Sequence, residues 1–533
     1  MTRPHMPTRS TALRSPRRAL TSTAVIAMLA AGLSLPGPVG ASEVVVQDDA
    51  ELLHRPTPQI RQTLRRLVEL GTDRVRITAG WSALAPAPDA ARPPRRDERG
   101  LIFYERRSSR YAREPMARLD RAIRLADAAG LAIQLDLAFW APRWAVARPL
   151  GSSVRQRWLP DVRRYARFVE AIAERYSGGF DDPRHPGRRL PAVRQWTTWN
   201  EPNHPGFLLP QWERADGRLR PVAPHHYRSM HEAGYRVLKR VNAANEVLLG
   251  GLASRGGRRP GERSGIQPLR FLRELACVDD RLEPLTDARC RAFAPLRADG
   301  FAFHPYTFGT SPYGPSARID EVGIGELHRL SALLGALQAR GRIDRVLPLY
   351  LTEYGYETNP PDRIRGVSER TQARYHGLAT FLAWQRPDVR MFPQFLVRDI
   401  GPDLRFAPGS SARYRDFQTG LFDVRGRAKP AVRAFRVPFW AYRDGGDAVL
   451  FGQVRPGAGT HLVRIEREVR PGRWEVAETR DARLPGSLLA TGFETDARGY
   501  FVRRLASPAP TRVRARWLRP SGGLPVSIDL VVR

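Results

Sequence analysis

Eight short apolar runs of strand character, separated by stretches of helical character, dominate the sequence between residues 43 and 440. The strand-like runs occupy residues 43–47, 73–81, 131–140, 193–201, 246–253, 299–307, 347–355 and 390–399. Helical patterns lie between them at 60–71, 115–130, 162–179, 227–242 and 326–341, and several end in glycine, as helix C-termini prefer. This alternation is typical of a parallel β/α architecture. Eight such units predict an α/β fold, the (β/α)8 TIM barrel.

The pattern changes after residue 440. Short strand-like runs at 448–454, 461–469, 474–479, 499–505, 511–518 and 526–532 are separated by Gly, Pro and Asp turns, and helical periodicity is lost. We therefore predict a barrel over 42–440 followed by a small all-β sandwich over 441–533. For the sandwich we favour a role in packing on the barrel, with carbohydrate or surface binding as the alternative.

The first 41 residues have the pattern of an export signal. Residues 1–20 carry five arginines and no acidic residue, an apolar run follows, and small residues surround a cleavage point after Ala41. The apolar run falls short of the roughly 20 residues that a membrane span needs. We expect a signal peptide over 1–41 and a secreted bacterial protein, with an uncleaved membrane anchor as the alternative. Arg17 and Arg18 leave twin-arginine export open beside the general route.

The chain is strongly basic, with a formal net charge of +33, and this raises the question of a nucleic-acid partner. Arginine supplies nearly all of the charge, since lysine occurs only at Lys239 and Lys429, and the arginines are spread through every region. No zinc-ligand spacing, basic helix or RNP-like aromatic motif accompanies them. We therefore expect no nucleic-acid partner, and affinity for acidic polymers or cell surfaces stays open. We also expect a monomer.

The two cysteines lie 290 − 277 = 13 positions apart, as Cys277 and Cys290 in a polar stretch. An exported protein meets an oxidising compartment, where such a pair can close a disulfide. We predict this disulfide, with two free thiols as the alternative.

Two glutamates stand where predicted strands end, which is where the active site of a TIM barrel is built. Glu201 lies in "RQWTTWNEPNH" directly before Pro202, at the end of the fourth run. Glu353 lies in "LPLYLTEYG" at the end of the seventh run, before Gly355. Two carboxyl groups at one rim suit the cleavage of glycosidic bonds, which needs one acid and one ionised group. Glu357 is a rival for the second role, although its position beyond Gly355 places it in the loop.

With "WNEP" ending a fourth strand and "TEYG" ending a seventh, residues 43–440 resemble the clan A glycoside hydrolases, the cellulase-like and xylosidase-like retaining barrel enzymes. The resemblance implies that Glu201 is the general acid/base and Glu353 the nucleophile. It also implies that Asn200 contacts the sugar 2-hydroxyl.

The resemblance assigns further roles along the barrel. It implies that His304 contacts the substrate or the acid, and that Tyr306 and Arg76 hold the nucleophile ionised. The residues alone leave two alternatives open, a core histidine at His304 and an ion pair in the barrel floor at Arg76. The tryptophan with which glucan-cleaving members end the eighth strand is missing from "RMFPQFLVRD". A sugar platform would then come from Phe395, or from Trp140 or Trp144 after the third strand.

These assignments predict hydrolysis of O-glycosidic bonds in a poly- or oligosaccharide with retention of configuration, without cofactor or metal. The carboxyl groups of Glu201 and Glu353 should then lie about 5 to 5.5 Å apart. The negative charge of Glu353 is expected to raise the pKa of Glu201. A non-catalytic exported protein that binds carbohydrate or cell wall on a barrel scaffold is the alternative. Trp196 and Trp199 are expected to pack in the barrel and not to contact sugar.

Overall fold

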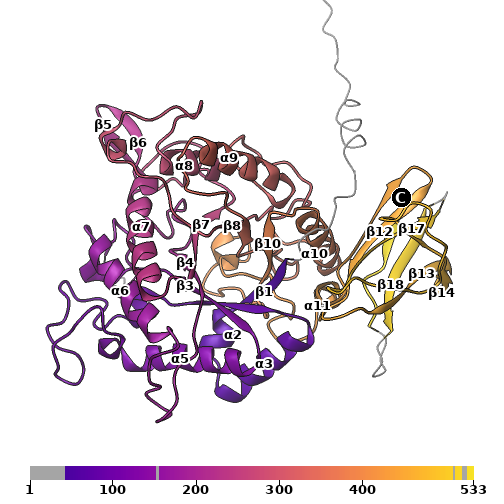
Figure 1. Cartoon of the computed structure of the whole chain (residues 1–533), viewed down its shortest axis with the longest axis horizontal. Coiled ribbons are helices and arrows are strands. Elements are labelled where there is room, and N and C mark those ends of the chain that lie inside the picture. Colours follow the sequence, from indigo (N-terminus) through magenta and orange to yellow (C-terminus); the bar gives the residue numbers. More distant parts are fainter. Residues whose placement is uncertain (1–41, 152–154, 508–509, 519–524, 533) are drawn as a thin grey trace, which may run out of the picture. The chain divides into compact units, whose positions relative to one another are not determined.

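The computed structural model describes residues 42–151, 155–507, 510–518 and 525–532 (Figure 1). The predicted signal peptide at 1–41 lies outside these residues. Among the described residues, no helix combines the length and the apolar character that crossing a bilayer requires.

Eight parallel strands close into a barrel in the order β1-β10-β9-β8-β7-β4-β3-β2, so the predicted TIM barrel is confirmed. Seven of the strands lie within predicted runs, and the eighth begins one residue before its run at 390–399. The strands are β1 (Glu43–Gln47), β2 (Arg74–Thr78), β3 (Ala132–Leu137), β4 (Gln195–Thr198), β7 (Glu246–Ala253), β8 (Gly300–His304), β9 (Leu349–Leu351) and β10 (Val389–Phe395). β4 and β9 are thus the fourth and seventh barrel strands in chain order.

Helices connect the strands and form the outer ring (Figure 1). They are α2 (Asp49–Leu53), α3 (Thr57–Glu69), α4 (Trp81–Leu84), α5 (Arg113–Ala128), α6 (Val162–Arg175), α7 (Ala223–Val241), α8 (Pro268–Leu275), α9 (Leu327–Ala339), α10 (Glu369–Trp384) and α11 (Pro430–Arg436). A hairpin of β5 (Trp212–Ala215) and β6 (Arg218–Pro221) is inserted between β4 and α7. The five predicted helices are all present, whereas the hairpin was not predicted.

An apolar layer inside the barrel supports the rim from below. It consists of Val45, Leu248, Ala302, Tyr350 and Met391, each from a different strand and each buried. Gln47 lies two residues after Val45, so both side chains leave β1 on the same side. The interior therefore changes from apolar to polar towards the carboxyl ends of the strands.

Two antiparallel sheets follow the barrel and share one core, as the predicted β-sandwich requires. One contains β11 (Phe439–Asp444), β12 (Asp447–Gln453), β15 (Arg480–Asp481) and β17 (Tyr500–Ala506). The other contains β13 (Leu462–Arg470), β14 (Arg473–Ala477), β16 (Phe493–Glu494), β18 (Thr511–Leu518) and β19 (Leu530–Val532). The predicted boundary after residue 440 falls inside β11.

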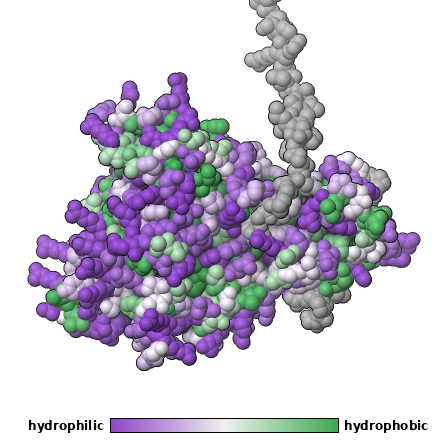
Figure 2. Space-filling model, in the orientation of Figure 1, coloured by the Kyte–Doolittle hydropathy of each residue, from purple (hydrophilic) through white to green (hydrophobic). Residues whose placement is uncertain are grey.

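Buried side chains of α10 and α11 belong to the sandwich core. Ala373 and Ala434 lie in the same apolar cluster as Leu450 and Ile465. Phe381 of α10 contacts Phe451 of β12, with ring centroids 5.2 Å apart. These contacts agree with the packing role favoured for the sandwich. On the face shown in Figure 2, the surface is mostly hydrophilic, with hydrophobic side chains in small separate patches.

Candidate active site

The two predicted glutamates meet at the carboxyl-end rim of the barrel. Glu201 comes three residues after β4 ends and Glu353 two residues after β9 ends. Their side chains are 15% and 10% exposed. One carboxylate oxygen of each and a ring nitrogen of His304 all lie within 4.8 Å of one another. Folding thus joins two carboxyl groups that are 353 − 201 = 152 residues apart in the chain.

The backbone around Glu201 is held in an unfavourable conformation. Trp199 and Glu201 have φ angles of 77° and 40°, in the left-handed region that non-glycine residues seldom adopt. Each such residue costs about 1–3 kcal/mol, which the surrounding structure must offset. The Glu201 N–H donates to the Gly251 carbonyl at 2.9 Å, beside an irregularity in the pairing of β7 with β8. At Gly250 a Cβ would lie 2.6 Å from the Ala302 carbonyl oxygen, so this bulge requires glycine.

Glu353 accepts hydrogen bonds on both carboxylate oxygens. The Arg76 guanidinium donates to Oε1 at 2.7 Å and the Tyr306 hydroxyl donates to Oε2 at 3.3 Å. Burial raises the pKa of Tyr306 well above its ordinary value, and the charge of Glu353 raises it further. Tyr306 therefore remains a neutral donor. The two contacts hold both oxygens of the Glu353 carboxylate in place.

Arg76 connects Glu353 to a polar layer that the sequence did not reveal. It is fully buried, and it also donates to Gln47, to Asp136 at 2.8 Å and to Asn200 at 3.0 Å. Burial raises the pKa of Asp136 to about 6, although the charge of Arg76 opposes this rise. The alternative considered for Arg76 was an ion pair in the barrel floor; Arg76 does form an ion pair, with Asp136, and this pair coexists with the bond to Glu353. Asp136 was not predicted, although a charged residue within the apolar run "AIQLDL" is a sequence signal that could have indicated it.

Glu201 is paired with His304. The Nδ1 atom of His304 lies 3.0 Å from Oε1 of Glu201 and 3.6 Å from Oε2 of Glu353. Burial is the largest influence on the pKa of Glu201 and raises it, but the hydrogen bond and charge of His304 and further cationic groups outweigh burial and lower that pKa. The prediction of a raised pKa is therefore wrong for this structure, because His304 touches the carboxylate more closely than Glu353 does. His304 is also no satisfied core histidine, since its buried Nε2 has no partner among the described residues.

The aromatic residues divide into packing and rim positions. Trp196 and Trp199 are fully buried, which confirms that they pack in the barrel. Trp140 lines a cavity of about 370 Å³ at the ends of β1, β2 and β3. Its indole N–H donates to the Gly206 carbonyl at 2.7 Å, and the Arg155 guanidinium lies 4.6 Å from its ring centroid. A sugar that stacks on this face would take the place of Arg155.

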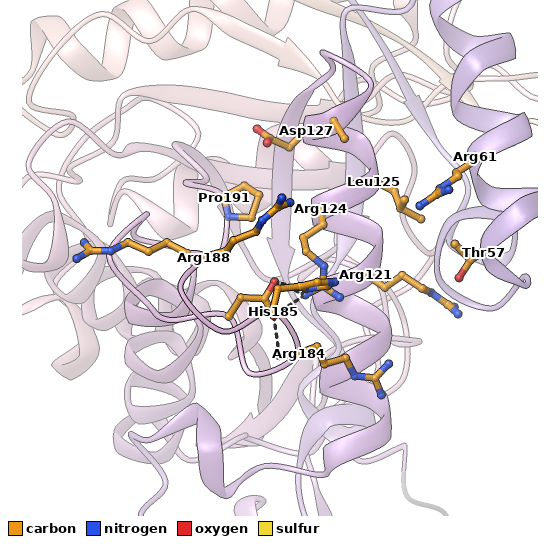
Figure 3. A pocket seen from close by; sticks show the side chains of 13 residues that line it. Thr57, Arg61, Arg121, Arg124, Leu125, Asp127, Arg184, His185, Arg188 and Pro191 are labelled. Atoms are coloured by element: carbon orange, nitrogen blue, oxygen red, sulfur yellow. Dashed lines mark hydrogen bonds and ion pairs between the residues drawn. The ribbon is translucent and has the colours of Figure 1, made fainter.

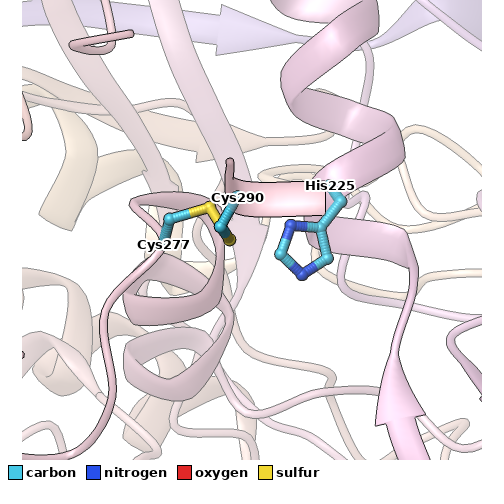
Figure 4. A group of neighbouring side chains, drawn as sticks. All are labelled: His225, Cys277 and Cys290. Atoms are coloured by element: carbon cyan, nitrogen blue, oxygen red, sulfur yellow. A yellow bond between two sulfur atoms is a disulfide. The ribbon is translucent and has the colours of Figure 1, made fainter. Parts of the chain in front are cut away.

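The predicted disulfide joins Cys277 and Cys290, so the alternative of two free thiols is wrong (Figure 4). His225 lies close enough to form a metal-ligand group with the two sulfur atoms, but these are bonded to each other and are not thiolates. Glu201, His304 and Glu353 form a second group of this geometry. In this second group Arg76 already forms an ion pair with Glu353, and the positive charge of Arg76 would repel a metal ion.

Comparisons with known proteins find solved structures of low similarity to this chain. Neither a protein-family model nor a curated protein matches the chain. A GH5_18 from Streptomyces cattleya in complex with GlcNAc is 18% identical, over 74% of this chain and 79% of that one, with a TM-score of 0.44. A glucosidase from Croceicoccus marinus is 14% identical, over 84% of this chain and 92% of that one, with a TM-score of 0.41. An endo-beta-1,4-mannanase from Thermotoga petrophila is 12% identical, over 93% of this chain and 97% of that one, with a TM-score of 0.39.

Proposed function

We propose that this chain is a retaining glycoside hydrolase that cleaves O-glycosidic bonds of a poly- or oligosaccharide. The observation that carries the proposal is the close approach of Glu201 and Glu353, whose nearest carboxylate oxygens lie within 4.8 Å at the barrel rim. Retaining enzymes hold their two carboxyl groups about 5–5.5 Å apart, whereas inverting enzymes leave about 6.5–9.5 Å for a water molecule. The separation in this chain supports double displacement.

In the first step the ionised carboxylate of Glu353 attacks the anomeric carbon. A bond forms between this carbon and a carboxylate oxygen, the glycosidic C–O bond breaks, and the leaving oxygen takes the proton of Glu201. In the second step Glu201 removes a proton from water, whose oxygen attacks the anomeric carbon and displaces Glu353. Two inversions restore the starting configuration.

The neighbours of the pair have separate tasks in this mechanism. Arg76 and Tyr306 fix both oxygens of Glu353 for the attack. Asn200 accepts from Arg76 through Oδ1, which directs its amide N–H groups towards a sugar hydroxyl. His304 controls the proton of Glu201 through the 3.0 Å contact. Because the pKa of Glu201 is lowered, the protonated acid becomes more abundant as the pH falls, and kcat/KM should rise towards acidic pH.

The test combines a panel of aryl glycosides and polysaccharides with three variants. Glu353→Ala should abolish turnover. Glu201→Ala should regain turnover of an activated aryl glycoside in the presence of azide and yield a glycosyl azide of retained configuration, because azide needs no general base. Glu357→Gln is the matched control and should keep normal turnover. Normal activity of Glu353→Ala would show that the assignment is wrong, and a product of inverted configuration by NMR would exclude double displacement.

We also propose that the chain is exported, on the basis of the pattern in residues 1–41. N-terminal sequencing of the protein released into the medium by its host would locate the cleavage point expected after Ala41.

A further inference from the structure

A larger cavity, of about 610 Å³, lies on the outer helical surface between α3, α5 and the connection from α6 to β4 (Figure 3). α5 ends shortly before β3 begins, and the connection at 176–194 leads into β4. Most of the lining therefore lies towards the N-terminal ends of the strands, whereas Glu201 and Glu353 lie at the carboxyl ends. The proposed reaction makes no use of this cavity.

The lining is rich in positive charge. Its arginines outnumber its two aspartates, Asp127 and Asp182, and they are Arg61, Arg121, Arg124, Arg184, Arg188 and Arg189. Asp182 is already paired, with Arg124 at 3.0 Å and His185 at 2.8 Å. Within the part of the chain that the structure describes, four of the six arginine side chains make no hydrogen bond or ion pair; they are Arg61, Arg184, Arg188 and Arg189. The cavity therefore holds uncompensated guanidinium groups.

The Arg121 side chain is held by backbone carbonyls. It is half-buried and donates to the backbone carbonyls of Leu53 and Arg55, both at 3.1 Å. Its buried Nε–H has no acceptor, and no carboxylate of the described residues pairs with it. Burial lowers the pKa of Arg121, and the like charges of Arg118, Arg184 and Arg124 lower it further. An oxyanion in the cavity would supply the missing acceptor and relieve this repulsion.

We propose that this cavity binds the oxyanion groups of an acidic polysaccharide, with Arg61, Arg121 and Arg184 as the principal contacts. The planar guanidinium fork matches carboxylate, sulfate and phosphate oxygens in bidentate geometry. The cavity volume of about 610 Å³ lies within the range of about 300–1,000 Å³ that is typical of ligand-binding cavities. The choice of a glycan, and not of the oxyanion itself, rests on the proposed function. The site would hold an acidic chain on the protein at a distance from the glutamates.

The binding experiment uses the full chain and a triple variant, Arg61→Gln with Arg184→Gln and Arg188→Gln. Arg121 is kept in this variant because its side chain also holds the backbone carbonyls of Leu53 and Arg55. The matched control removes the same charge from exposed arginines elsewhere, with Arg340→Gln, Arg374→Gln and Arg470→Gln. Calorimetry measures binding of an oligogalacturonate, a sulfated oligosaccharide, inorganic sulfate and duplex DNA. We expect the pocket variant to bind at least one of the two acidic oligosaccharides about tenfold or more weakly, while the control changes by less than about twofold.

Three outcomes would overturn the proposal. Equal losses in the two triple variants would mean that binding follows net charge and not this cavity. Unchanged oligosaccharide binding in the pocket variant would exclude the cavity as the site. Pocket-dependent binding of DNA without binding of either oligosaccharide would exclude a glycan ligand. Turnover of a small aryl glycoside should be normal in the pocket variant. Absence of turnover in the unmodified chain would refute the proposed function while leaving the oxyanion binding measurable.

Discussion

Replacing Glu357 with glutamine is expected to stabilise the folded protein at alkaline pH and to leave turnover normal. Glu357 lies four residues beyond Glu353, is 8% exposed, and accepts a hydrogen bond from the Gln418 N–H at 3.0 Å. Burial raises its pKa from 4.5 to about 7, although the bond from Gln418 opposes this rise. Glutamine keeps the shape and an acceptor for Gln418, and it removes the cost of a buried negative charge.

The magnitude follows from the two pKa values. The difference between about 7 in the folded protein and 4.5 in the unfolded chain corresponds to about 3 kcal/mol when the group is ionised in both states. A raised carboxyl pKa means that the folded protein binds the proton more tightly, so stability from this group is present below pH 4.5 and is lost as the pH rises through about 7. The gain from Glu357→Gln should therefore be about 2–3 kcal/mol larger at pH 8.5 than at pH 5.

Urea unfolding of the variant and the unmodified protein at both pH values measures this difference. An exposed substitution, Glu98→Gln, is the control and should have the same small effect at pH 5 and pH 8.5. A gain for Glu357→Gln that is independent of pH would refute the assignment of the cost to a buried charge. Loss of turnover in Glu357→Gln would instead show that Glu357 takes part in the reaction. The assignment of Glu353 as the sole nucleophile would then fail.

Three further predictions concern the site. His304→Asn removes the contact that lowers the pKa of Glu201. The pKa of Glu201 should then rise, and the alkaline limb of the kcat/KM profile should move to higher pH. An alkaline limb that stays at the same pH would contradict the pairing of Glu201 with His304. Asp136→Asn removes one of the two carboxylates that pair with Arg76, so Arg76 and the Glu353 that it holds should shift. We expect kcat to fall about 10-fold to 100-fold with little change in KM, and an equal rise in KM would indicate a substrate contact. Dialysis against a chelator should leave turnover unchanged, because both steps use carboxyl groups alone, and loss of activity restored by a divalent metal would refute a metal-free mechanism.

The order of the barrel could be predicted from the sequence because each strand and helix carries its own local signal. Apolar runs of the "EVVVQ" type mark strands buried on both faces, and amphipathic runs that end in glycine mark the helices between them. The β5–β6 hairpin lies in a stretch where this signal is weak, since "WERADGRLRP" has few apolar residues. This hairpin was therefore not predicted from the sequence.

The sequence by itself determined the eightfold alternation and the positions of Glu201 and Glu353 at the ends of the fourth and seventh barrel strands, because strand ends are fixed by local residues such as Pro202 and Gly355. The residues alone did not determine which groups touch them: the contacts of His304, Arg76 and Tyr306 were expected only from the resemblance, and the tertiary structure decided them. Closure of the barrel brings Arg76 and Asp136 from neighbouring strands beneath Glu353, and it places His304 beside Glu201. The lowered pKa of Glu201 depends on a contact between residues 304 − 201 = 103 positions apart, which no local pattern encodes.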